Sequence, residues 1–162
     1  MAIGGTGSGQ TLTLTWASLT QRAFLVGAGD TLVIKNATGT TSGGLVKNGP
    51  GTLRLDAQNG YTGTTTINDG SIRLEGGANR IKSGNNVVVN TSGTLDLNTY
   101  DQTLTSLTGG GHITMGSGGS VLTVANGDFS GDISQNGALT KNTTGTLVLR
   151  GANTYSGATT LI

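Results

Sequence analysis

The sequence contains no cysteine, a single proline and few charged residues. The absence of cysteine excludes a disulfide framework, and it fits a protein that crosses an envelope unfolded, where early disulfides would be a hazard. Charged residues make up 10% of the chain, compared with about 25% in ordinary globular domains. The net charge is +1, and the nine basic residues form no run. This distribution lacks the footprint of a protein that binds nucleic acid or an anionic membrane, so we expect no nucleic-acid partner.

Segments that would target or anchor the chain are also missing from the sequence. Met1 to Gly5 has neither the basic region nor the apolar core of a signal peptide. No apolar stretch approaches the roughly 20 residues that a membrane-spanning helix needs. Aromatic residues are 4% of the chain, too few for a base-stacking surface.

Glycine, by contrast, is abundant, with 30 residues in a chain of 162. High glycine with little charge is compatible with disorder, but here the glycines separate short apolar alternations such as Leu53-Arg54-Leu55 and Leu95-Asp96-Leu97. Such alternation is typical of half-buried strands, and no segment places apolar residues at helical spacing. We therefore predict an all-β chain. Its short strands lie near residues 11–16, 22–26, 31–35, 44–47, 52–55, 64–67, 71–74, 86–89, 94–97, 103–107, 112–115, 120–124, 130–133, 138–141, 146–149 and 158–162.

Two stretches of the chain are nearly identical at a constant register. They are residues 43–75, called copy 1 here, and residues 136–162, called copy 2. Matching residues such as Lys47 and Lys141 lie 94 positions apart throughout. A repeat at fixed register favours a solenoid over a sandwich or a barrel. Copy 2 stops at Ile162, in mid-repeat, so we expect an excised piece or one unit of a longer polymer.

The predicted fold is a right-handed parallel β-helix with three strands per coil, about 30 residues per coil and roughly five coils. We expect residues 1–42, which do not fit the repeat, to form an N-terminal cap or a divergent coil, and residues 43–162 to form one continuous domain. The open edges at both ends are liable to pair with other chains. The predicted inward residues are Leu45, Leu53, Leu55, Ile67, Ile72, Leu74, Val87, Val89, Leu95, Leu97, Leu104, Leu107, Ile113, Met115, Val121 or Leu122, Val124, Ile133, Leu139, Leu147 and Leu149.

Three motifs recur in both copies. Copy 1 contains Leu45-Val46-Lys47, then Gly51-Thr52-Leu53-Arg54-Leu55, then Asn59-Gly60-Tyr61-Thr62-Gly63. Copy 2 repeats the first motif as Leu139-Thr140-Lys141, the second as Gly145-Thr146-Leu147-Val148-Leu149 and the third as Asn153-Thr154-Tyr155-Ser156-Gly157. In these motifs the chain resembles the autotransporter-associated β-strand repeat, or passenger-associated repeat, of bacterial autotransporter and adhesin passengers.

The resemblance implies a large bacterial protein, secreted or on the cell surface, whose β-helical passenger leaves through an outer-membrane barrel in the parent protein. That translocator barrel and a host or cell-surface glycan or protein are the implied partners. We expect a non-enzymatic structural segment, such as an adhesin stalk or an export-supporting repeat. Two alternatives stay open. One is a subunit of an extracellular fibre that self-associates through the open β-helix ends, and the other is a carbohydrate-binding or carbohydrate-cleaving β-helix.

No residues suggest a catalytic, cofactor-binding or metal site, and we expect no enzyme and no cofactor. His112 is the only histidine, and without a second histidine or a cysteine we expect a solvent-facing strand position. Two carboxylate pairs, Asp128 with Asp132 and Asp96 with Asp101, would allow glycoside chemistry if adjacent coils brought them together. Their glycine and asparagine neighbours favour turn roles instead.

Other glycine-rich and aromatic positions point to structure. Residues Gly5-Thr6-Gly7-Ser8-Gly9 precede a strand signal and not a helix, which argues against a phosphate loop. The glycine runs lack the aspartates of calcium-binding nonapeptides. We expect the rings of Tyr61 and Tyr155 to cover the exposed side of their turns, while Asn59 and Asn153 bond the turn backbone.

Overall fold

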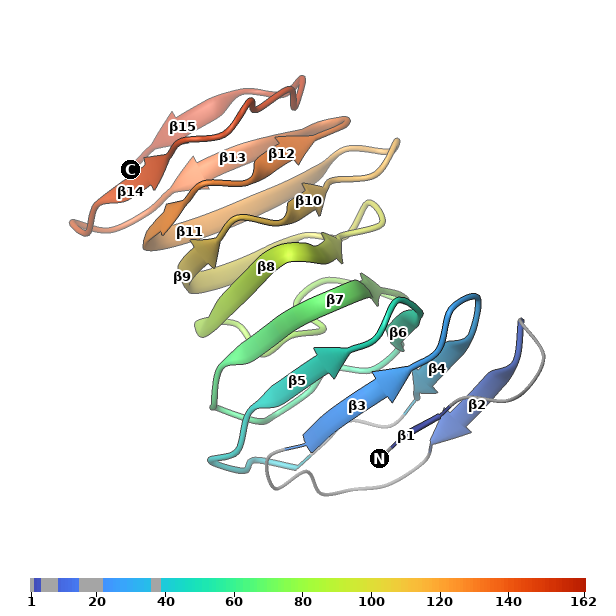
Figure 1. Cartoon of the computed structure of the whole chain (residues 1–162). Coiled ribbons are helices and arrows are strands. Elements are labelled where there is room, and N and C mark those ends of the chain that lie inside the picture. The colour runs from blue at the N-terminus through green and yellow to red at the C-terminus, as the bar shows by residue number, and fades with distance from the viewer. Residues whose placement is uncertain (1, 4–8, 15–21, 36–38) are drawn as a thin grey trace.

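A computed structural model describes residues 2–3, 9–14, 22–35 and 39–162, and all regular structure in these ranges is strand. The strands are β1 (Ala2–Ile3), β2 (Thr11–Leu14), β3 (Arg22–Val26), β4 (Thr31–Ile34), β5 (Leu45–Asn48), β6 (Thr52–Leu55), β7 (Thr65–Leu74), β8 (Asn85–Asp96), β9 (Gln102–Gly109), β10 (His112–Thr114), β11 (Ser120–Phe129), β12 (Asp132–Ser134), β13 (Gly137–Lys141), β14 (Leu147–Leu149) and β15 (Thr159–Leu161). The strands stack in chain order along one axis (Figure 1). All pairings among them are parallel, which confirms the predicted β-solenoid class.

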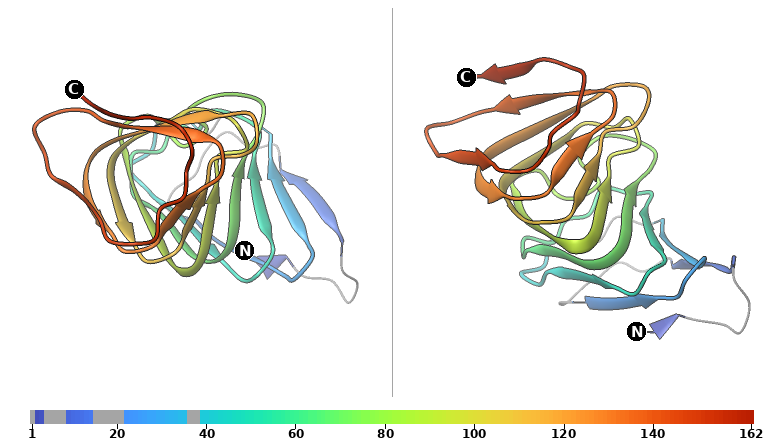
Figure 2. Two further views of the ribbon diagram at one scale, coloured as in Figure 1. Left: turned by 90° about the horizontal axis from the view of Figure 1, so that it is seen from above. Right: turned by 45° about the horizontal axis from the view of Figure 1, so that its top comes forward.

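The described strands line up in three ladders of parallel pairs. Ladder A runs β1–β3–β5–β7–β8–β9–β11–β14. Ladder B runs β2–β4–β6–β7–β8–β10–β12, and ladder C runs β9–β11–β13–β15. The long strands β7 and β8 pass from ladder A to ladder B, whereas β9 and β11 pass from ladder C to ladder A. Viewed along the stack, successive coils overlie one another as loops around a shared interior (Figure 2).

Each coil is shorter than the sequence suggested. Leu45 pairs with Thr65, and Leu107 pairs with Gly127, so one coil takes about 20 residues. The expected 30 residues per coil and five coils are therefore wrong, and ladder B alone has seven described rungs. The reason lies in tight corners: β5 ends at Asn48 and β6 begins at Thr52, which leaves three residues for the turn.

Glycine makes these tight corners possible. Gly70 sits at the corner between ladders A and B with a φ of +66°. A Cβ atom there would lie 2.5 Å from the Gly49 oxygen and 2.8 Å from Lys47 Nζ. Any larger residue would be strained by this φ and would also collide with the coil below.

The interior contains the apolar residues predicted to face inward. All of that set are at most 2% exposed except Leu147 and Leu149, which are half-buried, and Val121, which is 37% exposed. Leu122 takes the inward position beside Val121 and is fully buried. The alternation in the sequence therefore predicted most of these inward positions correctly, but it missed other core residues, namely Phe24, Val26, Leu32, Ile34, Tyr61, Ile81 and Phe129.

The N-terminal strands continue the same ladders. β3 pairs with β5 and β4 pairs with β6, both in parallel register. The division into a cap or divergent coil at 1–42 and a domain at 43–162 stays a prediction, since part of the first range lies outside the described residues.

Candidate functional site

The first repeat motif places a lysine inside the solenoid. Leu45 and Lys47 share one face of β5, and both are fully buried. Lys47 Nζ donates to the carbonyls of Asn48 (3.0 Å) and Gly49 (2.5 Å) in its own corner and of Asp69 (3.1 Å) in the next coil. Burial lowers the pKa of Lys47 to about 8, and the charge of Asp69 opposes this shift. The ammonium group thus ties together the corners of two adjacent coils.

The third motif forms the loop between β6 and β7. The Asn59 side-chain amide donates to the carbonyl of Ala57 in the loop and to that of Arg80 on the next coil, both at 2.9 Å. The Tyr61 ring is fully buried, and its hydroxyl hydrogen-bonds the Thr65 hydroxyl at 2.7 Å. Burial raises the pKa of Tyr61 well above its usual value, against the effect of the bond to Thr65. This loop is therefore part of the core.

Two sequence predictions concerned these loops. Asn59 bonds the turn backbone as expected, and so does Asn153, whose amide donates to the Gly151 carbonyl at 3.0 Å. The expectation that Tyr61 covers the exposed side of its turn is wrong, because the ring has no exposed surface. The next coil covers it: the Asn85 side chain donates to the Tyr61 carbonyl at 2.8 Å and closes the loop from that side.

Copy 2 makes the same contacts within its own corner and loop, but its side chains are less buried. Lys141 Nζ donates to the carbonyls of Asn142 (3.1 Å) and Thr143 (2.7 Å). The hydroxyls of Tyr155 and Thr159 are 2.7 Å apart, the same distance as in copy 1. Lys141 and Tyr155 are only half-buried. No described residue gives Lys141 the third carbonyl that Lys47 receives from the following coil.

The two copies also occupy different ladders. In copy 1, β5 lies in ladder A and β6 in ladder B, whereas in copy 2, β13 lies in ladder C and β14 in ladder A. Accordingly, the loop of copy 2 stacks on β12, where Thr154 donates its N–H to the Ile133 carbonyl and Ile133 donates to Asn153 Oδ1. The interval of 94 residues is not a whole number of coils of about 20 residues. The motif thus forms the same corner in both copies. This corner lies between ladders A and B in copy 1 and between ladders C and A in copy 2, so copy 2 is turned by one ladder around the axis.

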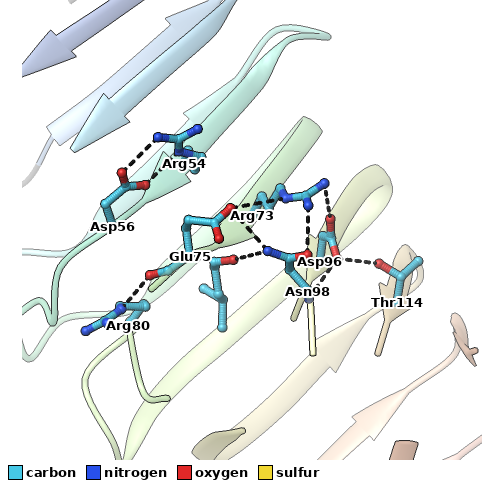
Figure 3. Close-up of polar contacts among 9 residues, drawn as sticks. Arg54, Asp56, Arg73, Glu75, Arg80, Asp96, Asn98 and Thr114 are labelled. Carbon is cyan, nitrogen blue, oxygen red and sulfur yellow. Dashed lines mark hydrogen bonds and ion pairs between the residues drawn. The ribbon is translucent and has the colours of Figure 1, made fainter. Parts of the chain in front are cut away.

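A strip of charged side chains runs along the outside of ladder B (Figure 3). Arg54 donates to both oxygens of Asp56, at 2.7 and 2.9 Å, and these bonds raise the pKa of Arg54. On the next coil Arg73 lies 3.8 Å from Glu75 and 3.5 Å from Asp96. Arg54 and Arg73 are direct neighbours in the ladder, so these carboxylates offset a repulsion between like charges. Both arginines are therefore paired with carboxylates of the same strip.

The candidate catalytic residues have other partners. His112 is exposed, as predicted for a solvent-facing strand position, and its Nδ1 is paired with Asp132 on the next rung. Asp128 accepts two hydrogen bonds from Arg150, which lower the pKa of Asp128. Asp101 accepts a hydrogen bond from the N–H of Val121 at 2.7 Å. The structure therefore gives each carboxylate a structural contact.

The remaining kinds of site to consider are a pocket, a metal site, a membrane-spanning helix and the phosphate loop. A shallow hollow beside the copy 1 loop is lined by Gln58, Asn59, Gly60, Lys82 and Ser83. Within the described ranges, no group of three or more histidine, aspartate or glutamate side chains is arranged to hold a metal ion. The same ranges contain no helix long and apolar enough to cross a membrane. Residues 5–8 of the glycine-rich segment considered as a phosphate loop lie outside the described residues.

Sequence reasoning missed the polar residues of the interior, although their phase was visible. Lys47 is two positions from Leu45, Asn85 is two from Val87, and Gln102 is two from Leu104, so each shares the inward face of its strand. The buried Gln102 amide donates to the carbonyl of Ile81 in the preceding coil at 3.0 Å. Asn85, Gln102 and Lys47 each bond backbone across coils, and such bonds are what permits their burial.

A parallel solenoid whose recurring motif serves to join one coil to the next defines the class: a β-helical repeat protein. The model of the passenger-associated-transport-repeat family matches residues 45–74 and 139–161, which carry the motifs described above. The chain thus carries two copies of the passenger-associated-transport repeat, the second of them matched over residues 139–161.

The similarity to one curated relative extends beyond the two repeat copies. The chain is 36% identical over 160 residues to the adhesin BmaC autotransporter of Brucella suis biovar 1 (strain 1330). The aligned region covers 88% of this chain and 5% of the relative, so the chain spans a small part of that protein's length. No solved structure matches the chain.

Proposed function

We propose that the chain is a non-enzymatic structural segment of a secreted or surface-exposed β-helical passenger, where it serves as an adhesin stalk. The observation that carries this proposal is the place of Lys47. The charged side chain of the motif is fully buried and binds backbone carbonyls of two coils, so a substrate has no access to it. The name of the relative, an adhesin autotransporter, supports the same reading. An outer-membrane translocator barrel in the parent protein and a host glycan or protein are the proposed partners.

The stalk would also support export. In this mechanism, coils that emerge at the cell surface stack on coils already folded, and the free energy of stacking opposes backward movement of the chain. Each leucine that a new coil buries, such as Leu53 or Leu55, contributes about 1.5–3 kcal/mol. The bond from Lys47 to the Asp69 carbonyl adds to this and requires the following coil.

An export assay tests this proposal. The chain is placed in a passenger upstream of a translocator barrel, and arrival at the surface is followed by protease accessibility over time. We expect Leu53→Asp, which breaks the core, to slow arrival severalfold and to leave a protease-sensitive passenger. Arg150→Ala, on an exposed side chain, is the matched control and should behave as wild type. Equal export of the wild type and of Leu53→Asp would refute the folding-driven mechanism.

Self-assembly into a fibre is a second candidate function. It is favoured by the exposed apolar residues beside the outer edge of β15, where Leu161 is 77% and Ile162 is 82% exposed. Sedimentation and electron microscopy over a range of concentrations test it. Filaments whose formation is blocked by Leu161→Asp would support the fibre, and a monomer at the highest concentration would contradict it.

A further inference from the structure

The hollow beside the copy 1 loop lies where one coil is longer than its neighbours. Between paired rungs, the segment from ladder B to ladder A advances 11 positions over residues 54–65 and 96–107, but 14 over residues 73–87. Lys82 and Ser83, which line the hollow, belong to this longer segment. Insertions in solenoids form loops on one face, and that face is often the binding face.

Hydrogen bonds hold the longer segment against both neighbouring coils. On one side, the Arg80 carbonyl accepts the backbone N–H of Asn59 at 3.1 Å and its side-chain amide at 2.9 Å. On the other side, Asn79 donates its N–H to the Asp101 carbonyl at 2.8 Å, and its Oδ1 accepts the N–H of Thr103 at 2.8 Å. The hollow is therefore preformed, which avoids part of the entropy cost of binding a ligand.

The hollow presents hydrogen-bond donors that have no partner in the protein. The Lys82 ammonium group, the Ser83 hydroxyl and the Gln58 amide form no side-chain hydrogen bond or ion pair with the described residues. Gln58 and Ser83 are exposed, and Lys82 is half-buried. None of the five described lining residues is acidic, so no side chain in the lining neutralises the charge of Lys82.

Copy 2 shows that the repeat motif does not need the Gln58 amide for its own fold. The position that matches Gln58 holds Ala152. The asparagine that follows makes the same bond in both copies, since Asn59 and Asn153 each donate to the carbonyl two residues earlier, at 2.9 and 3.0 Å. Gln58 is therefore available for a contact outside the motif.

The wall of the hollow also contains an unpaired acceptor. Asn59 is fully buried, and its Oδ1 has no hydrogen-bond partner among the described residues. In copy 2 the matching Asn153 Oδ1 accepts the Ile133 N–H at 3.0 Å. Buried acceptors without a partner are rare in folded proteins, and a ligand hydroxyl is a donor of the kind that this wall lacks.

We propose that the hollow binds an acidic sugar, that is, a sugar ring with one carboxylate, as in a uronate unit of a glycan. The carboxylate pairs with Lys82 Nζ, and ring hydroxyls bind the Gln58 amide and the Ser83 hydroxyl. The hollow measures 430 Å³, within the range of about 300–1,000 Å³ for small-molecule sites. A single cation among neutral polar groups matches one negative charge among hydroxyls, whereas phosphate is held by arginine forks or by several backbone N–H groups.

Titration with methyl β-glucuronide, followed by amide chemical shifts, tests the proposal. We expect saturable changes at Gly60, Ser83 and Gly84, with a dissociation constant in the millimolar range, and none at Thr123. Methyl β-glucoside, which has the same ring without the carboxylate, should cause no saturable change. No change with up to about 50 mM glucuronide, or equal changes with the glucoside, would overturn the proposal. Acetate or inorganic phosphate that binds as tightly as the glucuronide would overturn the assignment to a sugar.

Variants locate the binding groups. Lys82→Gln should weaken glucuronide binding about fivefold to tenfold, and Gln58→Ala, which introduces the copy 2 residue, about threefold or more. Arg150→Gln is the matched control, because it removes the same charge from an exposed side chain outside the lining, and it should leave binding unchanged. Equal losses in Lys82→Gln and Arg150→Gln would contradict the site.

A further measurement covers the case in which Lys82→Gln does not fold. Raising sodium chloride from about 50 to 500 mM should then weaken glucuronide binding to the wild type severalfold, because salt screens the pair with Lys82; binding that does not depend on salt would overturn the proposal. The inference rests on the proposed function in that it gives the chemical class of the glycan partner. The two fail separately: absent binding leaves the export assay unaffected, and failed export leaves the titration result standing.

Discussion

Replacing Lys47 by methionine tests how the repeat joins its coils. Methionine keeps most of the apolar stem and removes three hydrogen bonds, at 3.0, 2.5 and 3.1 Å. Bonds from a charged donor contribute about 1.5–3 kcal/mol each. A pKa lowered from 10.5 to about 8 corresponds to a burial cost of about 3 kcal/mol for the charged form. The summed contribution of the three bonds, less this burial cost, predicts that Lys47→Met lowers the free energy of unfolding by about 3 kcal/mol at pH 7.

Lys141→Met is the matched control within the same chain. Its ammonium group has two backbone acceptors, is half-buried and is partly screened by solvent. We expect a loss below about 1 kcal/mol. Urea unfolding followed by far-ultraviolet circular dichroism, with the slope checked for constancy, measures both variants. Equal losses in the two variants, or a more stable Lys47→Met, would refute the assignment of Lys47 as an inter-coil tie.

Three further predictions concern pH, the buried tyrosine and a corner. Between pH 8 and 10.5, Lys47 is protonated to a larger extent in the unfolded chain than in the folded chain. The free energy of unfolding should therefore rise with pH, by at most about 1.4 kcal/mol per pH unit. Urea titrations from about pH 8 to 9.5 should show this rise in the wild type and not in Lys47→Met. Tyr61→Phe should lose about 1–2 kcal/mol in urea unfolding through its buried hydrogen bond, and Tyr155→Phe less than about 0.5 kcal/mol; equal losses would contradict the difference in burial. Gly70→Ala should lose more than about 2 kcal/mol in thermal unfolding, because strain and collision add, whereas Gly119→Ala, with positive φ but open space, should lose about 1 kcal/mol; similar losses would mean that the collision is relieved.

The sequence predicted the strands and the core because both follow from a period of two. Leu53 and Leu55 alternate with polar residues, and the structure buries both. The glycines between such segments predicted the turns, and Gly70 shows why larger residues are excluded from one of them. Strand, core and class are local properties, so one sequence was enough for them.

The number of residues per coil depends on which distant strands pair with each other, and it was predicted wrongly. The repeat spans about one coil plus the start of the next, and its spacing of 94 residues fits several coil lengths equally well. The inward place of Lys47 was missed because a charged residue is rarely buried without partners. Its partners, above all the Asp69 carbonyl, come from a neighbouring coil, and the alignment of coils is known only from the fold.

Engineered cysteine pairs test the central claim, that copy 2 is turned by one ladder relative to copy 1. Thr123 and Thr140 are paired neighbours of β11 and β13 in ladder C, and the chain has no other cysteine to interfere. Adjacent strands lie about 4.8 Å apart, within the Cα range of a disulfide. We predict rapid oxidation of the pair Thr123→Cys with Thr140→Cys, and none of Asp128→Cys with Thr140→Cys. The reverse result would place β13 in ladder A, as in copy 1, and would contradict the account.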